Sequence, residues 1–471
     1  MGDKRWISTA ISSAFVATLW MVKDTSAGAD HKPRLKVVVA GEATTPDCLR
    51  GDRIQWGRAH PEKADGCAIA AGANAALGSA LTADARDRFQ LEFIDDGGNT
   101  ESAEAVARRI ESDPDVLAVI GHTASDTTRR AISFYAEAGI PLLMPVATSP
   151  DVNRPADSGA GPALRPLLPT WADVHWNSHY ELPNAFRLIA NDGMAQVPAL
   201  AYAATKLTTG KIVIVADLSD DPEYGQFLAS HLAPKLRSRR MDVDPVIRIQ
   251  KTDLKAGHPP QEIYGQILNA QLVIFCGTKE RATALLQSLS QWPGARSSKW
   301  PKFLLSDSSR PMSSFPAGVD LYVTFPVPEF REPLTDDEKR VVDAAVYAGG
   351  QSYEVFAYDA VLLLSRAVVS VRNAGAPLSR ATLSDALSKI VDFQGVKTEY
   401  SFFRGENFHP DYHVYSAGPN VVKGAVCESR TTPAPPQTSA TAASAPPVSR
   451  SDVLTYDCEI APDDLATMRR H

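Results

Sequence analysis

The sequence predicts an α/β protein built from two consecutive parallel-sheet halves. Apolar runs such as 35–40 (LKVVVA) and 272–276 (LVIFC) show no polar alternation, which is typical of strands buried on both faces. Helical segments such as 102–112 carry their small and apolar residues on one face. Strands and helices follow one another in strict alternation, and that order favours a parallel sheet covered by helices.

The first half contains four predicted strands separated by helices. The turn 95–98 (DDGG) ends the second strand, because aspartate and glycine favour turns. The strands are expected at 35–40, 89–94, 116–120 and 141–144, and the helices at 68–81, 102–112 and 127–138.

The second half repeats this plan and ends with two long helices and a hairpin. Strands are expected at 211–216, 246–249, 272–276 and 303–305, and helices at 197–207, 224–233, 263–268, 280–291, 353–374 and 378–390. Pro234 is expected to end helix 224–233, because proline lacks a backbone N–H. Segments 400–403 and 413–415 are expected to form a closing hairpin around 404–407.

The N-terminal sequence predicts that the protein is exported from the cytosol. Lys4 and Arg5 precede an apolar stretch at 7–22, which is shorter than the ~20 residues that span a bilayer. The small residues 27–29 (AGA) then fit a cleavage site, so residues 1–29 are predicted to be a signal peptide, with an uncleaved anchor as the alternative. The mature protein would be periplasmic or otherwise exported, and soluble.

Two segments interrupt the alternation. Residues 153–183 form an insertion rich in proline and aromatic residues, placed directly after the fourth strand. Residues 430–450 (RTTPAPPQTSATAASAPPVSR) have almost no apolar anchor, and their composition predicts a disordered linker or tail.

Composition excludes several classes of protein. A hydrophobic content of 44% and a charged content of 22% exclude a wholly disordered chain, a fibrous repeat and a multi-span membrane protein. A net charge of -7 gives no electrostatic reason to expect a nucleic-acid partner. His175 and His179 stand four residues apart, but Trp176 replaces the glutamate that a zinc protease needs. We therefore expect no enzyme activity, no cofactor and no metal.

The five cysteines agree with export. Cys276 lies in an apolar run and is expected to be a buried small hydrophobe. The other four allow three connectivities, of which Cys48–Cys67 and Cys427–Cys458 close the shortest loops and are preferred. Such bonds persist outside the cytosol. Free thiols throughout are the alternative.

Four stretches of the chain match the pattern of a known family. They are 91–99 (LEFIDDGGN); 119–125 (VIGHTAS) continuing into 135–150 (YAEAGIPLLMPVATSP); 211–217 (KIVIVAD) with Tyr224-Gly225; and 358–361 (YDAV). Over residues 34–415 the chain resembles the leucine-binding-protein-like periplasmic substrate-binding proteins of branched-chain amino acid ABC transporters.

The resemblance implies a type I periplasmic-binding fold, in which two parallel-sheet lobes are joined by a three-strand hinge with a ligand cleft between them. We expect the first lobe at 34–185 with 322–352, insertion included, and the second at 186–321 with 353–415. Residues 416–471 are then a Pro/Ala/Ser/Thr-rich tail with a Cys427–Cys458 link.

In the first lobe the candidate ligand contacts follow the third and fourth strands. Ser125 opens a helix, where a hydroxyl and free N–H groups suit a carboxylate, although a plain helix N-cap is the alternative. The resemblance implies that Ser125 and Thr148 bind the α-carboxylate of the ligand. Val146 would supply backbone groups, and Ala147 lies in the same ligand-binding stretch.

In the second lobe the resemblance implies that Tyr224 packs over the ligand and that Asp307 receives its ammonium group by a charge-assisted hydrogen bond. A core aromatic and an ordinary polar residue after a strand are the respective alternatives. Thr278 stands where the amino-acid binders often carry an aromatic residue. That departure weakens any claim for leucine, isoleucine or valine specifically.

The long loop 41–67 also departs from the family pattern. It carries Glu42, Arg50 and Trp56, which are additional candidate contacts, with solvated loop residues as the alternative. The sequence therefore predicts a monomeric receptor for a small amino-acid-like ligand, serving an ABC permease. A sensory ligand-binding module is the second hypothesis, and a scaffold that binds no ligand is the third.

Overall fold

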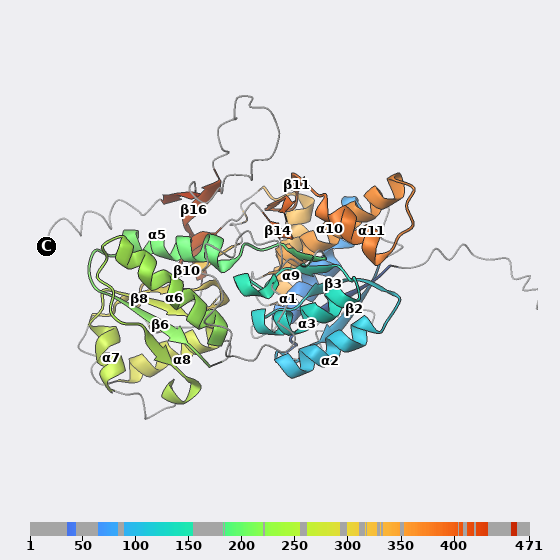
Figure 1. The fold of residues 1–471 in the computed structure, drawn as a ribbon. Helices are drawn as coiled ribbons and strands as arrows, with labels where there is room; N and C mark the ends of the chain where they lie inside the picture. The colour runs from blue at the N-terminus through green and yellow to red at the C-terminus, as the bar shows by residue number, and fades with distance from the viewer. Residues whose placement is uncertain are drawn as a thin grey trace, which may run out of the picture. The chain divides into compact units, whose positions relative to one another are not determined.

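The computed structural model of the chain describes most residues between 35 and 458. The described residues are 35–43, 65–82, 89–153, 182, 184–219, 222–254, 261–292, 299–309, 316, 318–326, 330, 333–348, 353–403, 405–407, 412–418, 421–431 and 454–458. Within them, the strands form a seven-stranded sheet, an eight-stranded sheet and a small two-stranded ladder (Figure 1).

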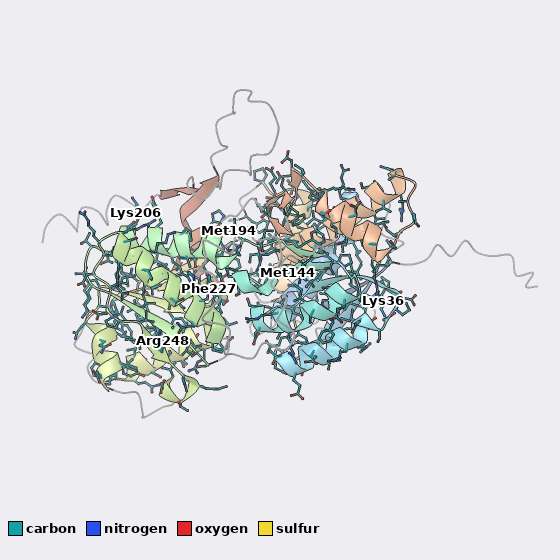
Figure 2. The ribbon with its side chains drawn as sticks, viewed as in Figure 1. Lys36, Met144, Met194, Lys206, Phe227 and Arg248 are labelled. Carbon is teal, nitrogen blue, oxygen red and sulfur yellow. The ribbon has the colours of Figure 1, made fainter. Side chains whose placement is uncertain are left out.

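The first sheet has the strand order β13-β14-β5-β4-β3-β1-β2. All neighbouring pairs are parallel except β13 with β14. Its strands are β1 (Leu35–Gly41), β2 (Phe89–Asp95), β3 (Val116–Gly121), β4 (Leu142–Met144), β5 (Ala185–Arg187), β13 (Phe402–Phe403) and β14 (Glu406–Asn407). Lys36 on β1 pairs with Glu92 on β2 and with Asp113 just before β3, at 2.6 and 2.7 Å (Figure 2).

Helices from both ends of the chain accompany the first sheet. They are α1 (Asp65–Ala76), α2 (Thr100–Glu111), α3 (Ser125–Glu137), α9 (Asp336–Ala348), α10 (Glu354–Asn373) and α11 (Arg380–Ser388). α1 packs against both α9 and α10. Gly72 lets α1 and α10 approach closely, because an added Cβ would lie 2.1 Å from the carbonyl oxygen of Glu354. Figure 1 accordingly shows the orange α10 and α11 beside blue and cyan elements.

The second sheet has the order β17-β16-β15-β10-β9-β8-β6-β7. Its strands are β6 (Ile212–Asp217), β7 (Ile247–Ile249), β8 (Leu272–Cys276), β9 (Lys302–Leu305), β10 (Leu321–Phe325), β15 (His413–Gly418), β16 (Val421–Thr431) and β17 (Leu454–Cys458). β6 to β10 pair in parallel, and β15 to β17 add an antiparallel extension. Its helices are α5 (Val197–Leu207), α6 (Pro222–Ser238), α7 (Gln261–Leu268) and α8 (Lys279–Gln291).

Shorter elements complete the described fold. They are the ladder β11 (Phe393–Gln394) with β12 (Glu399–Tyr400), the π-helical turn η5 (Asp192–Gln196), and the 3₁₀ turns η2 (Ala80–Thr82), η3 (Pro150–Asn153), η6 (Lys251–Leu254) and η8 (Asp307–Ser309). Central strands are buried along their whole length: every residue of β6 and β8 is buried, as their continuous apolar sequences predict. The predicted α/β class with two largely parallel sheets is confirmed.

The structure corrects two details of the sequence prediction. α6 continues past Pro234 to Ser238, because Leu232 and Leu236 are fully buried and their packing outweighs the local cost of proline. The predicted hairpin between 400–403 and 413–415 does not form. Instead β13 pairs with β14, because Gly405 adopts a φ of +76° and turns the chain back at once.

The structure also differs from the predicted lobe boundaries. Residues 353–415 were assigned to the second lobe, yet α10 packs on α1 and β14 pairs with β5 of the first sheet. Residues 322–352 were assigned to the first lobe, yet β10 pairs with β9 of the second sheet. Apolar periodicity identifies a helix or strand but carries no information about which sheet it joins.

Several predictions fall on residues that the structure does not describe. These are the signal peptide 1–29, most of the insertion 153–183 with His175 and His179, and the tail 432–450. A search of the described residues for a helix long and apolar enough to cross a membrane finds none. Cys276 is a buried free thiol, as predicted. Cys67 is buried in α1, but Cys48 is not described, so their pairing stays a prediction.

Candidate functional site

The carboxyl ends of β3 and β4 bring Ser125 and the segment 146–149 together. Ser125 is the first residue of α3, and its hydroxyl accepts a hydrogen bond from the backbone N–H of Ser149 at 3.2 Å. The N-cap residue Ala124 provides no side-chain cap. Asp126 Oδ1 accepts from the backbone N–H of Thr127 at 2.7 Å, so part of the helix start is already used. The first N–H groups of the helix, beside a hydroxyl that can still donate, can hold an anionic oxygen.

A fully buried arginine holds the backbone of this segment. Arg187, the last residue of β5, donates to the carbonyl oxygens of Ala147 and of Ser149, the latter at 3.0 Å. Its Nε lies 3.1 Å from the carboxylate of Glu406 on β14. The predicted contacts Val146, Ala147 and Thr148 therefore lie on a loop tied to two neighbouring strands.

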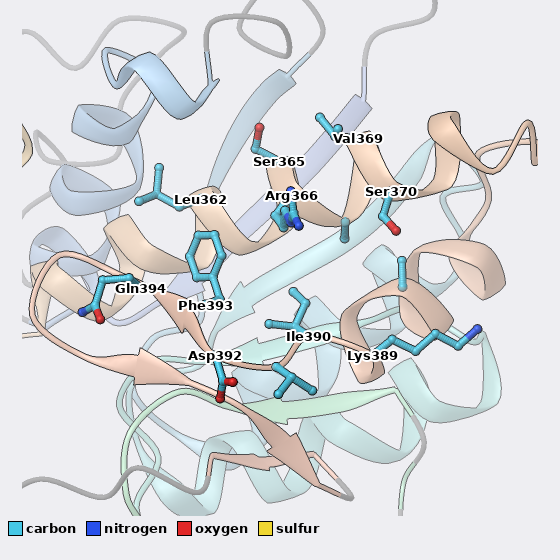
Figure 3. Close-up of a pocket in the computed structure, with 13 residues that line it drawn as sticks. Leu362, Ser365, Arg366, Val369, Ser370, Lys389, Ile390, Asp392, Phe393 and Gln394 are labelled. Carbon is cyan, nitrogen blue, oxygen red and sulfur yellow. The ribbon is translucent and has the colours of Figure 1, made fainter.

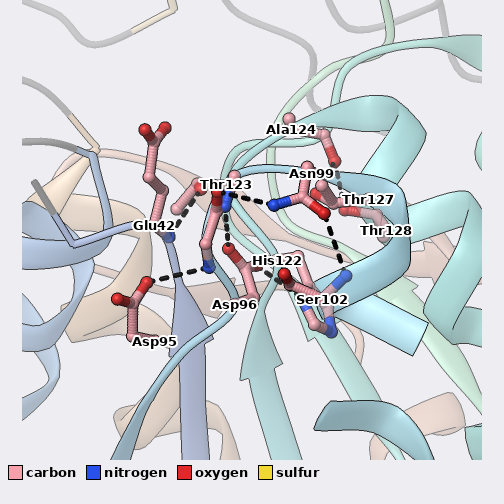
Figure 4. A network of polar contacts seen from close by, with 12 residues as sticks. Glu42, Asp95, Asp96, Asn99, Ser102, His122, Thr123, Ala124, Thr127 and Thr128 are labelled. Carbon is pink, nitrogen blue, oxygen red and sulfur yellow. Dashed lines mark hydrogen bonds and ion pairs between the residues drawn. The ribbon is translucent and has the colours of Figure 1, made fainter. Parts of the chain in front are cut away.

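A buried Asp–His–Tyr chain lies behind the same edge of the first sheet. His122 Nδ1 lies 2.6 Å from Asp96 Oδ2, and its Nε2 lies 2.9 Å from the hydroxyl of Tyr135. All three residues are fully buried, and Figure 4 shows Asp96 and His122 among the polar groups that follow β2 and β3. Burial, followed by the negative charge of Asp96, raises the pKa of Tyr135. These hydrogen bonds hold together the segments that follow β2 and β3, and none of the three side chains is accessible to solvent.

Glu42 follows β1 at this edge and is solvent-exposed. Its backbone N–H donates to the Thr123 hydroxyl at 3.3 Å (Figure 4). Partial burial, followed by the negative charges of Asp96 and three other acidic side chains, raises the pKa of Glu42. Arg50 and Trp56, the other two candidates of this loop, lie outside the described residues.

The second sheet brings Tyr224 and Asp307 into direct contact. Asp307 opens η8 after β9 and is fully buried. The Tyr224 hydroxyl, from the first turn of α6, donates to Asp307 Oδ1 at 2.5 Å. Gln196 Nε2 donates to the same oxygen at 2.8 Å, and the Tyr412 hydroxyl donates to Oδ2 at 2.7 Å. Burial, then the charges of Asp307 and Asp192, raise the pKa of Tyr224.

Thr278 lies at the neighbouring strand end. It is the N-cap of α8, but its side chain makes no capping hydrogen bond. Its Oγ1 is buried and has no hydrogen-bond partner in the described part of the chain. The loops after β8 and β9 are joined because the Ser306 hydroxyl bonds both the N–H and the carbonyl of Gly277, at 3.1 and 3.0 Å. Thr278 is therefore held close to the loop that carries Asp307.

Sequence reasoning missed three residues of these clusters: Arg187, Gln196 and Tyr412. Arg187 lies in a three-residue strand, and Gln196 ends a π-helical turn, an element that periodicity does not reveal. Tyr412 immediately precedes β15. One signal in the sequence could have identified Arg187: it is a charged residue inside the otherwise apolar segment 185–190 (AFRLIA).

A separate cavity of about 460 Å³ lies between α10, α11 and the segment 389–394 (Figure 3). Leu362 and Ile390 line it together with Arg366. None of the predicted ligand contacts lines this cavity. It is distinct from the two strand-end clusters.

Comparison with known proteins identifies the family. The sequence model of the periplasmic binding proteins matches residues 61–418, which is more than half of the chain. The chain belongs to the periplasmic binding protein family. The type I fold predicted from the sequence is likewise confirmed by solved structures of the same architecture.

Two solved structures illustrate the architecture that this periplasmic binding protein shares. An ABC transporter substrate-binding protein from Desulfitobacterium hafniense, in complex with leucine, has a TM-score of 0.57 and 20% identity, covering 83% of this chain and 99% of that one. A branched-chain amino acid transporter substrate binding protein from Streptococcus pneumoniae, in complex with isoleucine, has a TM-score of 0.60 and 15% identity, covering 83% and 98%. At such identities the likeness concerns the fold.

Two further relatives differ in the bound ligand or in the length of the match. An R. palustris solute binding protein, in complex with 4-hydroxybenzoate, has a TM-score of 0.59 and 12% identity, covering 83% of this chain and 96% of that one. A Pseudomonas aeruginosa amino acid binding protein is 27% identical over 161 residues. That match spans only 34% of this chain and 35% of the relative.

Proposed function

We propose that this protein is an exported solute-binding receptor that captures a small amino-acid-like ligand between its two lobes and delivers it to an ABC importer. The observation that carries the proposal is the chemistry of the strand ends. Both sheets carry buried polar side chains at their carboxyl edges, where open α/β sheets bind ligands. Membership of the periplasmic binding protein family supports a binding role.

The first lobe would hold the carboxylate of the ligand. The Ser125 hydroxyl and the uncapped start of α3 provide donors, and Thr148 provides a second hydroxyl. Val146 and Ala147 would contribute backbone groups from the loop that Arg187 holds in place. In the second lobe, Tyr224 and Thr278 would complete the site, since they lie at adjoining strand ends around the buried Asp307.

The ligands bound in structures of the same fold support a small ligand for this protein. Leucine, isoleucine and 4-hydroxybenzoate are each a small molecule with one carboxyl group and an apolar body. Closure of two lobes around such a molecule is a common transition of α/β receptors. We further propose that the mature protein is a periplasmic, soluble, non-enzymatic monomer after cleavage of residues 1–29, and that a membrane ABC permease is its partner.

Sensing is the alternative function. The same fold can pass ligand-driven closure to a membrane or periplasmic signalling partner, because fold alone does not determine function. A gene for a permease or an ATPase beside this one favours transport. A neighbouring kinase or regulator gene favours sensing.

Ligand screening by thermal shift tests the proposal directly. Binding to the native state alone raises the melting temperature by mass action, and a ligand at 100 times its Kd adds about 2.7 kcal/mol of stability. We expect at least one amino acid or small carboxylate to raise the melting temperature. Ser125→Ala should abolish the shift, whereas Ser238→Ala, at the exposed end of α6, should preserve it. If no compound of the panel stabilises the protein, the proposed ligand class is wrong.

A further inference from the structure

The carboxylate of Asp307 already accepts hydrogen bonds from several donors of the protein. Oδ1 accepts from the Tyr224 hydroxyl at 2.5 Å, from Gln196 Nε2 at 2.8 Å and from the backbone N–H of Ser308 at 2.7 Å. Oδ2 accepts from the Tyr412 hydroxyl at 2.7 Å. The exposed fraction of Asp307 is 0%, so solvent does not reach it.

Five donor contacts surround the carboxylate, counting the Ser308 hydroxyl at 3.4 Å from Oδ1. Each oxygen of an ionised carboxylate offers about two lone-pair sites, so Oδ1 is saturated and Oδ2 keeps about one. A ligand ammonium group carries three N–H donors and no acceptor. Oδ1 can accept an ammonium group only if Gln196, Tyr224 or Ser308 moves away, and a displaced group would then need a new partner in a buried place. The remaining site on Oδ2 is shielded because the side chain is fully buried.

The donors come from separate elements and also bond one another. Gln196 ends η5, Tyr224 opens α6 and Tyr412 precedes β15. Gln196 Nε2 lies 3.2 Å from the Tyr224 hydroxyl and 3.4 Å from the hydroxyl of Thr324 on β10. Asp307 is therefore a common acceptor for three segments of the chain. Removing its charge affects all three at once.

We propose that Asp307 is an internal anchor, and that the receptor binds small monocarboxylates that lack an ammonium group at least as tightly as the matching amino acids. The proposal rests on the proposed function, because it concerns the ligand of the same site. The ligand is held through its carboxylate at Ser125 and the start of α3. Gln196, Tyr224 and Ser308 occupy Oδ1 from within the protein, and burial shields the remaining site on Oδ2.

Paired ligands that differ only in the α-ammonium group test the ligand class. The probes are L-leucine with 4-methylpentanoate and L-phenylalanine with 3-phenylpropanoate, measured by calorimetry on the full chain. We expect the carboxylate of at least one pair to bind as tightly as its amino acid, or more tightly. A preference of tenfold or more for the amino acid, abolished by Asp307→Asn, overturns the proposal.

Tyr412→Phe supplies a second test, in which an acceptor site on Asp307 is opened rather than removed. This change frees an acceptor site on Oδ2 without altering the charge of Asp307. We expect the ratio of amino-acid affinity to carboxylate affinity to rise at least threefold. Tyr264→Phe, a buried tyrosine in α7, is the matched control and should leave the ratio unchanged. A ratio that stays constant in Tyr412→Phe contradicts the filled-acceptor argument.

The ligand-free protein separates this proposal from the proposed function. If Asp307 is an internal anchor, Asp307→Asn should lower the melting temperature by roughly 5 °C or more, because two tyrosines and Gln196 lose an ionised acceptor. Asp320→Asn, at an exposed aspartate before β10, should change it by less than about 1 °C. An unchanged or raised melting temperature in Asp307→Asn overturns the anchor role. Should no paired ligand bind, the proposed function fails, while this measurement still decides the role of Asp307.

Discussion

Replacing Arg187 by methionine measures how far the loop after β4 depends on one buried guanidinium group. The change keeps an unbranched side chain of similar length but removes the hydrogen bonds to the carbonyls of Ala147 and Ser149. It also leaves Glu406 without the cation that lies 3.1 Å from it. Removing one partner of a buried ion pair costs about 3–5 kcal/mol. Because the Glu406 side chain is 26% exposed and solvent can take over part of its charge, we expect about 3 kcal/mol.

Urea unfolding followed by circular dichroism gives this free-energy difference. Arg248→Met is the control: Arg248 is exposed on β7 and bonds only one described side chain, Gln226, so its loss should cost less than about 1 kcal/mol (Figure 2). Adding Glu406→Gln should recover part of the loss in the Arg187 variant, because the unpaired charge is then gone. A loss under about 1 kcal/mol in Arg187→Met would refute the reasoning.

Three further predictions concern stability and covalent structure. Gly72→Ala should cost roughly 2–4 kcal/mol in denaturant unfolding, because its Cβ meets the α10 backbone, whereas Gly265→Ala, with open space, should stabilise by about 0.5–1 kcal/mol. Burial raises the pKa of Asp359 from 3.8 to about 7, so the native state keeps a proton that the unfolded state has lost, and the contribution of Asp359 to stability should fall by up to about 4 kcal/mol from pH ~4 to pH ~7. Asp359→Asn should remove that fall when the free energy of unfolding is compared at pH 4 and pH 8. If the variant loses as much stability between these pH values as the original protein, the prediction is wrong. Cys427 and Cys458 are partners in the β16–β17 register. Non-reducing peptide mapping of the exported protein should therefore find them joined by a disulfide, and two free thiols at these positions would contradict the prediction.

The sequence was informative where local chemistry repeats. Continuous apolar runs identified β6 and β8 to within one residue of their ends, because a strand covered on both faces leaves no room for polar alternation. The order of strands and helices then predicted two largely parallel sheets. Ser125 and Asp307 were predicted from the family resemblance together with their places after strands, and the structure places them after β3 and β9. Their contact with a ligand stays a prediction.

The rest depends on contacts between distant parts of the chain. Arg187 meets Glu406 across more than two hundred residues, and Tyr412 meets Asp307 across 105. α10 joins the first sheet through Gly72 of α1, a contact that its own apolar pattern does not specify. Amphipathic patterns show that a face will be buried but not against what. The donors that fill the Asp307 carboxylate could therefore be seen only in three dimensions.

The antiparallel strands that extend the second sheet set a limit on how the protein can be shortened. The family match ends at residue 418, which invites truncation there. β15 ends at Gly418 and pairs with β16 on the side away from β10. Cutting the chain at 418 would leave that row of backbone N–H and carbonyl groups open to a second molecule. A soluble fragment for crystallisation or ligand screening should therefore keep the residues through Cys458.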